Sequence, residues 1–254
     1  MIKKINLSII QALRTDFRNI NYMQKEYAKK NSEYLKKNPS WHIEDSSWKA
    51  IQVIKMFNRN KLRPQSIAEI GCGAGEILFQ LQEKIGSPAI TFTGYDISPD
   101  AIDLASTRAR PGLSFHKEDL IEKDLRFDVL LMLDVFEHVE DYIGFIRKSA
   151  AKATYKIYHI PLDFSVNGIL RNIPGRTREL VGHLHYFTKD TAIETLKYTD
   201  QTIIDYFYTL VSIEVHNKKM GTKILNVIRR IMFKISPHLT VKLFGGYSLL
   251  VLSK

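Results

Sequence analysis

The 254 residues are 44% hydrophobic, 25% charged and 11% aromatic, a balance typical of one well-filled globular domain. The single cysteine, Cys72, excludes a disulfide framework and any zinc site built on cysteines, and it indicates a reducing, cytoplasmic location. No apolar run approaches the roughly 20 residues that span a membrane. The N-terminal segment lacks a small-residue cleavage site, so we expect no signal peptide.

The net charge of +10 is divided unevenly along the chain. Residues 1–60 carry 12 Lys/Arg and 5 Asp/Glu, residues 61–215 carry 17 and 22, and residues 216–254 carry 8 and none. This division suggests that the basic ends meet an anionic surface while the acidic centre serves another purpose. Solubility alone would explain the same charges equally well.

Residues 1–60 are polar with helical periodicity, and we expect them to form an N-terminal helical cap. A loop at 38–40 separates a Lys-rich segment from a second helix, whose large apolar residues recur at helical spacing: Trp48, Ile51, Ile54 and Phe57. After Pro64, short apolar runs alternate with helical patterns. Strands are predicted at 67–70, 90–95, 113–116, 127–133 and 154–160, and helices at 76–85, 99–109 and 138–150. This alternation indicates a parallel sheet that is covered by helices on both faces.

The end of the chain departs from this alternation. Thr188 is a good N-cap for a helix that reaches about residue 198. A strand-like run at 202–215, a basic amphipathic helix at 222–235 and a last strand at 247–252 follow. The segment 161–187, rich in Gly, Pro, Asn, Arg and His, is expected to be a functional loop.

A glycine-rich turn is the sharpest motif. An apolar strand runs into Gly71, Gly73 and Gly75 and then opens a helix, whose N-terminus offers unpaired N–H groups to a ligand. A dinucleotide fingerprint would need glycine where Glu76 stands, and the Gly-Lys-Ser/Thr of a P-loop is absent. Asp96 ends the next predicted strand, where a carboxylate can accept both ribose hydroxyls of an adenosine.

Four segments in order carry a resemblance to a known family. They are Glu-Ile-Gly-Cys-Gly-Ala-Gly at 69–75, Gly-Tyr-Asp at 94–96, His-Lys-Glu-Asp at 116–119 and the run at 127–139 that ends in Asp-Val-Phe-Glu-His-Val. Together they resemble the class I S-adenosylmethionine-dependent methyltransferases, in particular the branch that includes ubiquinone-biosynthesis O-methyltransferases and many small-molecule and sugar methyltransferases. The resemblance covers about residues 44–254. Glu69 departs conservatively from the family's usual Asp.

The resemblance implies a fold and a division of the chain. We expect an α/β protein with a Rossmann-like, doubly wound seven-stranded sheet, mostly parallel with the last strand antiparallel, plus N-terminal helices. The methyltransferase domain would span 61–254, with a substrate-side loop at 161–187.

The resemblance also assigns S-adenosylmethionine as cofactor and places residues against it. Gly71, Gly73 and Gly75 would line its methionine and ribose part, Asp96 would hold the ribose hydroxyls, and Asp119 with Leu120 would flank adenine. Further cofactor-binding residues implied in this way are Glu69, Cys72, Ile97 and Asp134. Read from the sequence alone, Cys72 is a small side chain that fills a crowded turn. The alternative for Asp119 is a solvated loop acid.

The protein's own part in methyl transfer is to position an acceptor and, for a hydroxyl, to remove its proton. Candidate bases fall into two groups: Asp134, Glu137 and His138 after one strand, and His159, His183 and His185. We favour His183 and then His138 as catalytic residues, because histidine titrates near working pH. Structural roles in the loop remain open for both.

Asp134, Glu137 and His138 also stand at i, i+3 and i+4, a spacing that could present ligands to a divalent ion. An acid-rich helix N-terminus explains the same residues, and we expect no metal. The chain lacks the Asn/Asp-Pro-Pro-Tyr/Phe motif that methyltransferases of nucleobase amines usually carry.

The leading hypothesis is an enzyme that methylates a small molecule or a glycan, with oxygen as the favoured acceptor. One alternative is an RNA methyltransferase, which the basic ends suggest but which lacks a basic stripe with interleaved aromatics. The other is a non-catalytic binding protein of the same fold. The sequence does not determine the oligomeric state.

The basic helix at 222–235 divides its residues between two faces. One face is apolar: Ile224, Leu225, Val227, Ile228, Ile231, Met232 and Ile235. The other is cationic: Lys223, Arg229, Arg230 and Lys234. The apolar face would ordinarily pack on the domain and leave the cations solvated. Alternatively this end, with the lysines of 25–37, rests on an anionic membrane surface.

Overall fold

The computed structural model describes residues 29–30, 43–210 and 220–254, with the side chains of the helix at 220–235 described from Asn226 onward. The helices predicted before residue 43 and most of the Lys-rich segment therefore lie outside the described residues. The last part of the strand predicted at 202–215 does as well.

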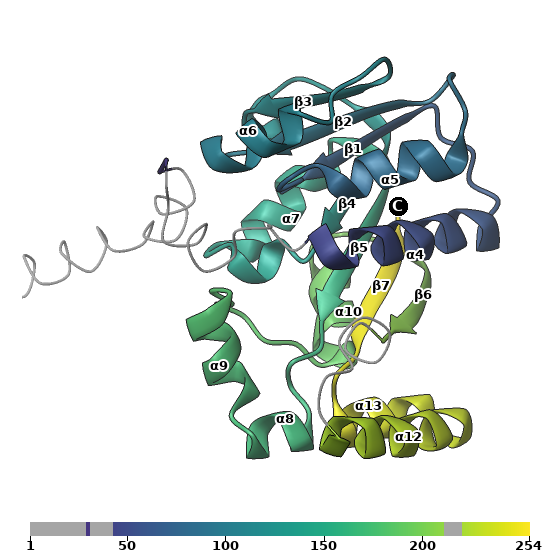
Figure 1. The fold of residues 1–254 in the computed structure, drawn as a ribbon, viewed down its shortest axis with the longest axis vertical. Coiled ribbons are helices and arrows are strands. Elements are labelled where there is room, and N and C mark those ends of the chain that lie inside the picture. Colours follow the sequence, from purple (N-terminus) through teal and green to yellow (C-terminus); the bar gives the residue numbers. More distant parts are fainter. Residues whose placement is uncertain (1–28, 31–42, 211–219) are drawn as a thin grey trace, which may run out of the picture.

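A seven-stranded sheet in the order β3-β2-β1-β4-β5-β7-β6 forms the centre of the molecule (Figure 1). Its strands are β1 (Ser66–Ile70), β2 (Thr91–Asp96), β3 (Leu113–Lys117), β4 (Phe127–Leu133), β5 (Ala153–Pro161), β6 (Ile203–Thr209) and β7 (Ser248–Ser253). Strands β1 to β5 pair in parallel, and β7 lies antiparallel to both β5 and β6. The predicted mostly parallel sheet with an antiparallel last strand is confirmed.

Helices cover both faces of the sheet. The helices of the described residues are α4 (Ser46–Arg59), α5 (Glu76–Ile85), α6 (Pro99–Ser106), α7 (Tyr142–Ala150), α8 (Val166–Leu170), α9 (Ile173–Leu180), α10 (Lys189–Tyr198), α12 (Met220–Ile235) and α13 (Pro237–Phe244). Short 3₁₀ turns are η1 (Ile43–Asp45), η2 (Leu120–Glu122) and η3 (Phe136–His138). Buried residues of α4 and α5 pack on one face, and those of α7 and α10 pack on the other. No helix in the described part of the chain is long and apolar enough to cross a membrane.

Helix boundaries differ from the prediction where side chains cap the backbone. The helix expected from 138 begins at Tyr142, because Asp141 accepts a hydrogen bond from the Gly144 N–H at 2.9 Å and starts α7 there. The residues before it form η3. The helix expected to reach 109 ends at Ser106.

The expectation of a loop at 161–187 is wrong in part, because the segment contains α8 and α9. Ser165 starts α8 by accepting a hydrogen bond from the Gly168 N–H at 2.9 Å. Pro174 lies in the first turn of α9, and Pro237 begins α13, which the sequence did not predict. Such short helices give weak periodic signals, and glycine or proline within them is typical of loops.

Candidate functional site

The carboxyl ends of the parallel strands β1, β2 and β4 lie together at one edge of the sheet, beside a cavity of about 420 Å³. Its wall includes the glycine turn, the residues after β2 and the residues after β4. Ligands of open α/β sheets bind at this edge, where the strand order reverses direction between β1 and β4.

The glycine turn between β1 and α5 depends on conformations that other residues rarely adopt. Gly71 and Gly75 have φ angles of 70° and 75°. A Cβ at Gly71 would lie 2.7 Å from a methyl carbon of Val135, and one at Gly75 would lie 2.5 Å from the Phe115 ring. Gly71 lines the cavity, whereas Gly75 is absent from its wall and instead allows close packing against Phe115.

Asp96 stands at the tip of β2 and is tied to the backbone on both sides. Its Oδ2 accepts from the Gly73 N–H at 2.9 Å, and its Oδ1 accepts from the Ser98 N–H at 2.8 Å. Burial raises the pKa of Asp96, and these hydrogen bonds partly offset that rise. Asp96 thus lies at the cavity in a fixed orientation, just before Ser98, which is the N-cap of α6.

The other cofactor candidates lie in different positions. Cys72, Ile97, Asp119 and Leu120 line the cavity together with Gly73. The Asp119 carboxylate also caps η2 by accepting from the Ile121 N–H at 2.9 Å.

Glu69 does not line the cavity. It is buried, with Oε2 lacking a hydrogen-bond partner. Burial raises its pKa to about 8 despite the nearby Lys49 ammonium.

A buried ion-pair network crosses the cavity wall at Asp134, which has a left-handed φ of 57°. Its Oδ2 lies 2.7 Å from the Lys49 ammonium, and its Oδ1 lies 2.5 Å from His159 Nδ1. Lys49 also pairs with Asp45 at 3.2 Å. Burial alone would raise the pKa of Asp134, but His159 and Lys49 hold it well below its usual range. Asp134 is therefore an anion that Lys49 and His159 hold in place.

Sequence reasoning missed Lys49 and Asp45. Both lie at the start of α4, far along the chain from Asp134, and no local pattern links them.

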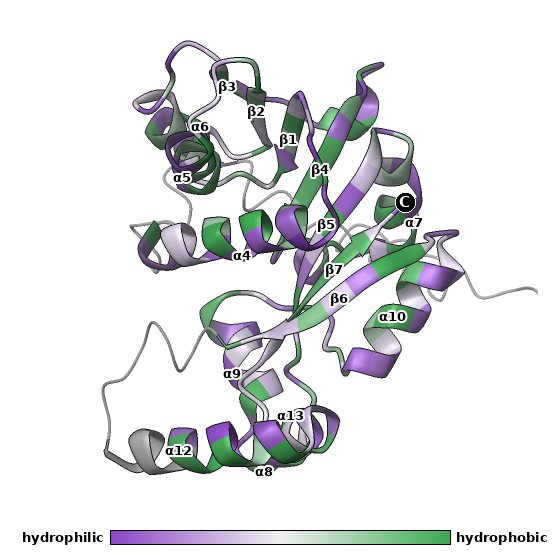
Figure 2. Ribbon diagram, turned by 90° about the vertical axis from the view of Figure 1, so that its right-hand side faces the viewer, coloured by the Kyte–Doolittle hydropathy of each residue, from purple (hydrophilic) through white to green (hydrophobic). Residues whose placement is uncertain are grey.

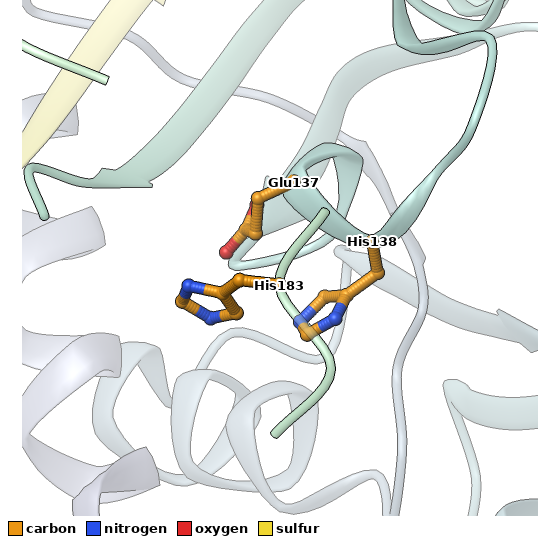
Figure 3. Close-up of side chains that lie close together, drawn as sticks. All are labelled: Glu137, His138 and His183. Carbon is orange, nitrogen blue, oxygen red and sulfur yellow. The ribbon is translucent and has the colours of Figure 1, made fainter. Parts of the chain in front are cut away.

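His183 and His138 lie close together (Figure 3), and both line the same cavity. Their ring centroids lie 4.9 Å apart with planes at 79°. Backbone hydrogen bonds hold the two residues near each other, because the N–H groups of Leu184 and His185 donate to the Glu137 carbonyl at 2.8 and 3.2 Å. These bonds hold the end of the 161–187 segment against η3.

Each of these two histidines has a defined contact on Nδ1. His183 Nδ1 lies 2.7 Å from Asp163 Oδ2, and His138 Nδ1 lies 3.3 Å from the Gly182 carbonyl. Since a carboxylate accepts hydrogen bonds, His183 carries its proton on Nδ1 and keeps Nε2 as the basic nitrogen. Asp163 gave no signal in the sequence.

The remaining histidine candidates lie elsewhere. His159 is buried between Asp134 and Thr209, whose Oγ1 lies 2.9 Å from its Nε2. His185 donates from Nε2 to the Val139 carbonyl at 3.0 Å and packs on the Tyr142 ring. Neither residue lines the cavity.

Glu137 is fully buried, and neither carboxylate oxygen has a hydrogen-bond partner. Burial and the Asp134 charge raise its pKa well above the usual value. Among the described residues, Glu137, His138 and His183 each present a ligand atom within 4.8 Å of the others. The metal alternative considered for Asp134, Glu137 and His138 therefore does not match the geometry, because Asp134 is held by Lys49 and His159 instead.

Comparisons with known proteins find similarity to methyltransferases. Residues 68–154 match a family model described as a methyltransferase domain. A ubiquinone biosynthesis O-methyltransferase of Methylobacterium nodulans is 34% identical over 110 residues, which cover 39% of this chain and 43% of the relative. A norajmaline N-methyltransferase of Rauvolfia serpentina is 29% identical over 107 residues, covering 39% of this chain and 36% of the relative. The chain thus matches less than half the length of these two curated relatives.

A solved structure shares the fold over almost the whole chain. The magnesium protoporphyrin IX methyltransferase of Synechocystis PCC 6803, with bound S-adenosylhomocysteine, superposes with a TM-score of 0.57 at 15% identity. The alignment covers 98% of this chain and 99% of that one.

Proposed function

We propose that this chain, which contains a class I S-adenosylmethionine-dependent methyltransferase domain with distant similarity to ubiquinone biosynthesis O-methyltransferases, methylates a hydroxyl of a small molecule or a glycan. One observation carries the proposal. A single cavity runs from the glycine turn and Asp96 to a histidine that a carboxylate orients.

The residues at the sheet edge fit the cofactor. Gly71 and Gly73 bring backbone close to the cavity without a side chain, as an approaching amino acid and ribose require. Asp96 supplies a fixed carboxylate for ribose hydroxyls, and Asp119 with Leu120 offers an acceptor and an apolar surface for adenine. Bound S-adenosylmethionine supplies the electrophilic methyl group.

The acceptor side of the cavity would be formed by residues of the 161–187 segment together with η3 and η1. His183 Nε2 takes the proton of an acceptor hydroxyl, and Asp163 holds the ring in the tautomer that leaves this nitrogen basic. Asp163 also stabilises the imidazolium that forms. His138 packs against the His183 ring and lines the same cavity.

The choice between acceptor atoms rests on this base. The matched relatives are named as an O- and an N-methyltransferase, so they support small-molecule methylation without selecting the acceptor atom. An alcohol or phenol must lose a proton during methylation, whereas a neutral amine attacks with its own lone pair. A carboxylate-oriented histidine in the cavity therefore favours oxygen.

Two experiments test the proposal. Calorimetric titration with S-adenosylhomocysteine should show binding, and its absence at millimolar ligand would contradict a methyltransferase of any kind. Methyl-labelled cofactor is then incubated with the protein and separated fractions of a cell extract. We expect label in small molecules or glycans, and label confined to the RNA fraction would instead identify an RNA methyltransferase.

A further inference from the structure

Helix α12 is turned the opposite way from most surface helices. Arg229, which the sequence placed on the solvent side, is only 5% exposed, and Asn226 beside it is 4% exposed. The aliphatic residues Ile231 and Ile235 are 57% and 72% exposed. The helix therefore presents polar side chains to the protein and its apolar stripe to the outside.

Specific contacts fix this orientation. Arg229 donates from Nη1 to Asn226 Oδ1 at 3.1 Å and from Nη2 to the Phe244 carbonyl at 2.7 Å. Phe233, on the same side of the helix, stacks on Tyr247 with ring centroids 5.1 Å apart. Rotating the helix to bury its aliphatic stripe would break these contacts, so the outward apolar face belongs to the folded protein.

Neighbouring helices extend the exposed apolar area. Helices α8, α12 and α13 lie together at one end of the molecule, as both views show (Figures 1 and 2). The exposed aliphatic side chains that they contribute, here called the apolar helix surface, include Ile169, Leu170, Ile231, Ile235, Leu239 and Leu243. Isolated exposed aliphatics are ordinary, but several on adjoining helices mark a contact site.

The charges beside this surface select its partner. Exposed Arg230 and Lys234 flank the stripe of α12, and exposed Arg171 follows α8. Residues 216–254 contain eight Lys/Arg and no Asp/Glu. Long cationic side chains beside an aliphatic stripe suit an interface of lipid tails and anionic headgroups, where the stems lie along apolar surface and the charges reach phosphates.

From these observations we infer that α8, α12 and α13 dock flat on an anionic lipid membrane through the apolar helix surface. The docking itself is independent of the chemistry in the cavity. Resting on the proposed function, it implies an amphiphilic acceptor that enters from the membrane. Val181, which follows α9 and lines the cavity, lies next in sequence to Leu180, which is 64% exposed.

Co-sedimentation with vesicles tests the docking. The full chain is mixed with vesicles of phosphatidylcholine alone or of phosphatidylcholine with phosphatidylglycerol. We expect binding to the anionic vesicles that weakens as salt is raised, and clearly less binding to the neutral ones. Equal binding to both, or none to either at low salt, would overturn the inference.

Two double variants separate the apolar and the electrostatic contributions. Ile231→Ser/Ile235→Ser should weaken binding to anionic vesicles by about tenfold or more. Arg230→Glu/Lys234→Glu should weaken it by at least about 25-fold, since each cation near such a surface contributes a factor of about five.

Matched controls carry the same substitutions away from this surface. Ile51→Ser/Leu125→Ser removes exposed aliphatics, and Lys84→Glu/Lys148→Glu reverses two exposed charges. Ile51→Ser/Leu125→Ser should bind anionic vesicles within about threefold of wild type, because it leaves the apolar helix surface intact. Lys84→Glu/Lys148→Glu should also stay within about threefold, except at low salt, where charge repulsion from the membrane is less screened and the drop is larger. Controls that fall as far as the test variants would contradict a specific surface.

Two further measurements keep the alternatives distinguishable. One outcome is that wild type binds no vesicles and sediments as a dimer, whereas Ile231→Ser/Ile235→Ser sediments as a monomer. The surface then joins two copies of the chain, and the inference is wrong. Binding of S-adenosylhomocysteine reports on the proposed function separately. If wild type binds S-adenosylhomocysteine but not vesicles, only the docking is rejected. If it binds anionic vesicles but not S-adenosylhomocysteine, only the proposed function is rejected.

Discussion

Lys49→Met should destabilise the protein more than any other single lysine change on α4. The Lys49 side chain is 10% exposed, and its ammonium lies between Asp134 at 2.7 Å and Asp45 at 3.2 Å. Burial opposes its charge, but these carboxylates raise the pKa of Lys49 above its usual value. Methionine fills a similar space and leaves the Asp45 and Asp134 carboxylates without their shared ammonium.

The expected loss follows from the burial of the partners. Removing one member of a buried pair costs about 3–5 kcal/mol. Asp134 is 25% exposed and keeps His159 at 2.5 Å, so we expect the lower end, about 3 kcal/mol. In a protein of this size that loss lowers the melting temperature by roughly 6–12 °C.

Urea and thermal unfolding at pH 7 measure the loss, with Lys55→Met as the control. Lys55 is exposed on the same helix and lies 4.8 Å from the centre of the Phe207 ring, a contact that contributes about 1 kcal/mol or less. If Lys49→Met loses no more free energy of unfolding than this control, the buried network does not stabilise the fold as reasoned here. The double variant Lys49→Met/Asp134→Asn should recover part of the loss, because it removes one uncompensated carboxylate.

Three further predictions concern Asp96, His183 and the buried Glu69. Asp96→Ala should weaken S-adenosylhomocysteine binding by roughly 1–3 kcal/mol in calorimetry, while Asp103→Ala on the nearby helix α6 should leave it unchanged; equal affinities would place the ribose elsewhere. His183→Ala should keep that affinity and lower turnover of an identified acceptor by about 10²–10⁴, and a fall of less than tenfold would leave His183 a structural residue. Burial raises the pKa of Glu69 from 4.5 to about 8, so between these pH values the folded state retains a proton that the unfolded chain loses. This contribution to stability is complete below pH 4.5 and is lost as the pH rises to 8. The free energy of unfolding of wild type should therefore fall relative to Glu69→Gln over this range, by up to about 1.4 kcal/mol per pH unit, and parallel pH profiles would show that Glu69 ionises alike in both states.

The proposed cofactor side of the cavity could be predicted because its signals are local. Gly71 and Gly73 stand within one turn, and Asp96 follows the next strand with Ser98 as a helix cap. Backbone conformation and strand order bring these residues together in any sheet of this topology. Gly75 shows the limit of the argument, because the same glycine pattern serves packing against Phe115.

The acceptor side could not be predicted in the same way. Asp163 contacts His183 across the two short helices α8 and α9, and Lys49 contacts Asp134 from helix α4, much earlier in the sequence. Such contacts depend on how whole elements pack, and neither residue type nor spacing encodes them. The orientation of α12 is a similar case, since periodicity defines two faces but not which one faces the protein.

Two buried acids, Glu69 and Glu137, are absent from the cavity wall but stand next in sequence to residues that line it. Burial first of all raises the pKa of both glutamates, and Asp134 in the wall pairs with the Lys49 ammonium. A strongly anionic wall would bind a positively charged donor most tightly before transfer, when the positive charge is greatest, and would oppose the loss of that charge. Pairing Asp134 with Lys49 and raising the pKa of the two buried glutamates both lower the negative charge that a donor in the cavity would meet. In the proposed function, Asp96 would bind the ribose and Asp163 would act through His183.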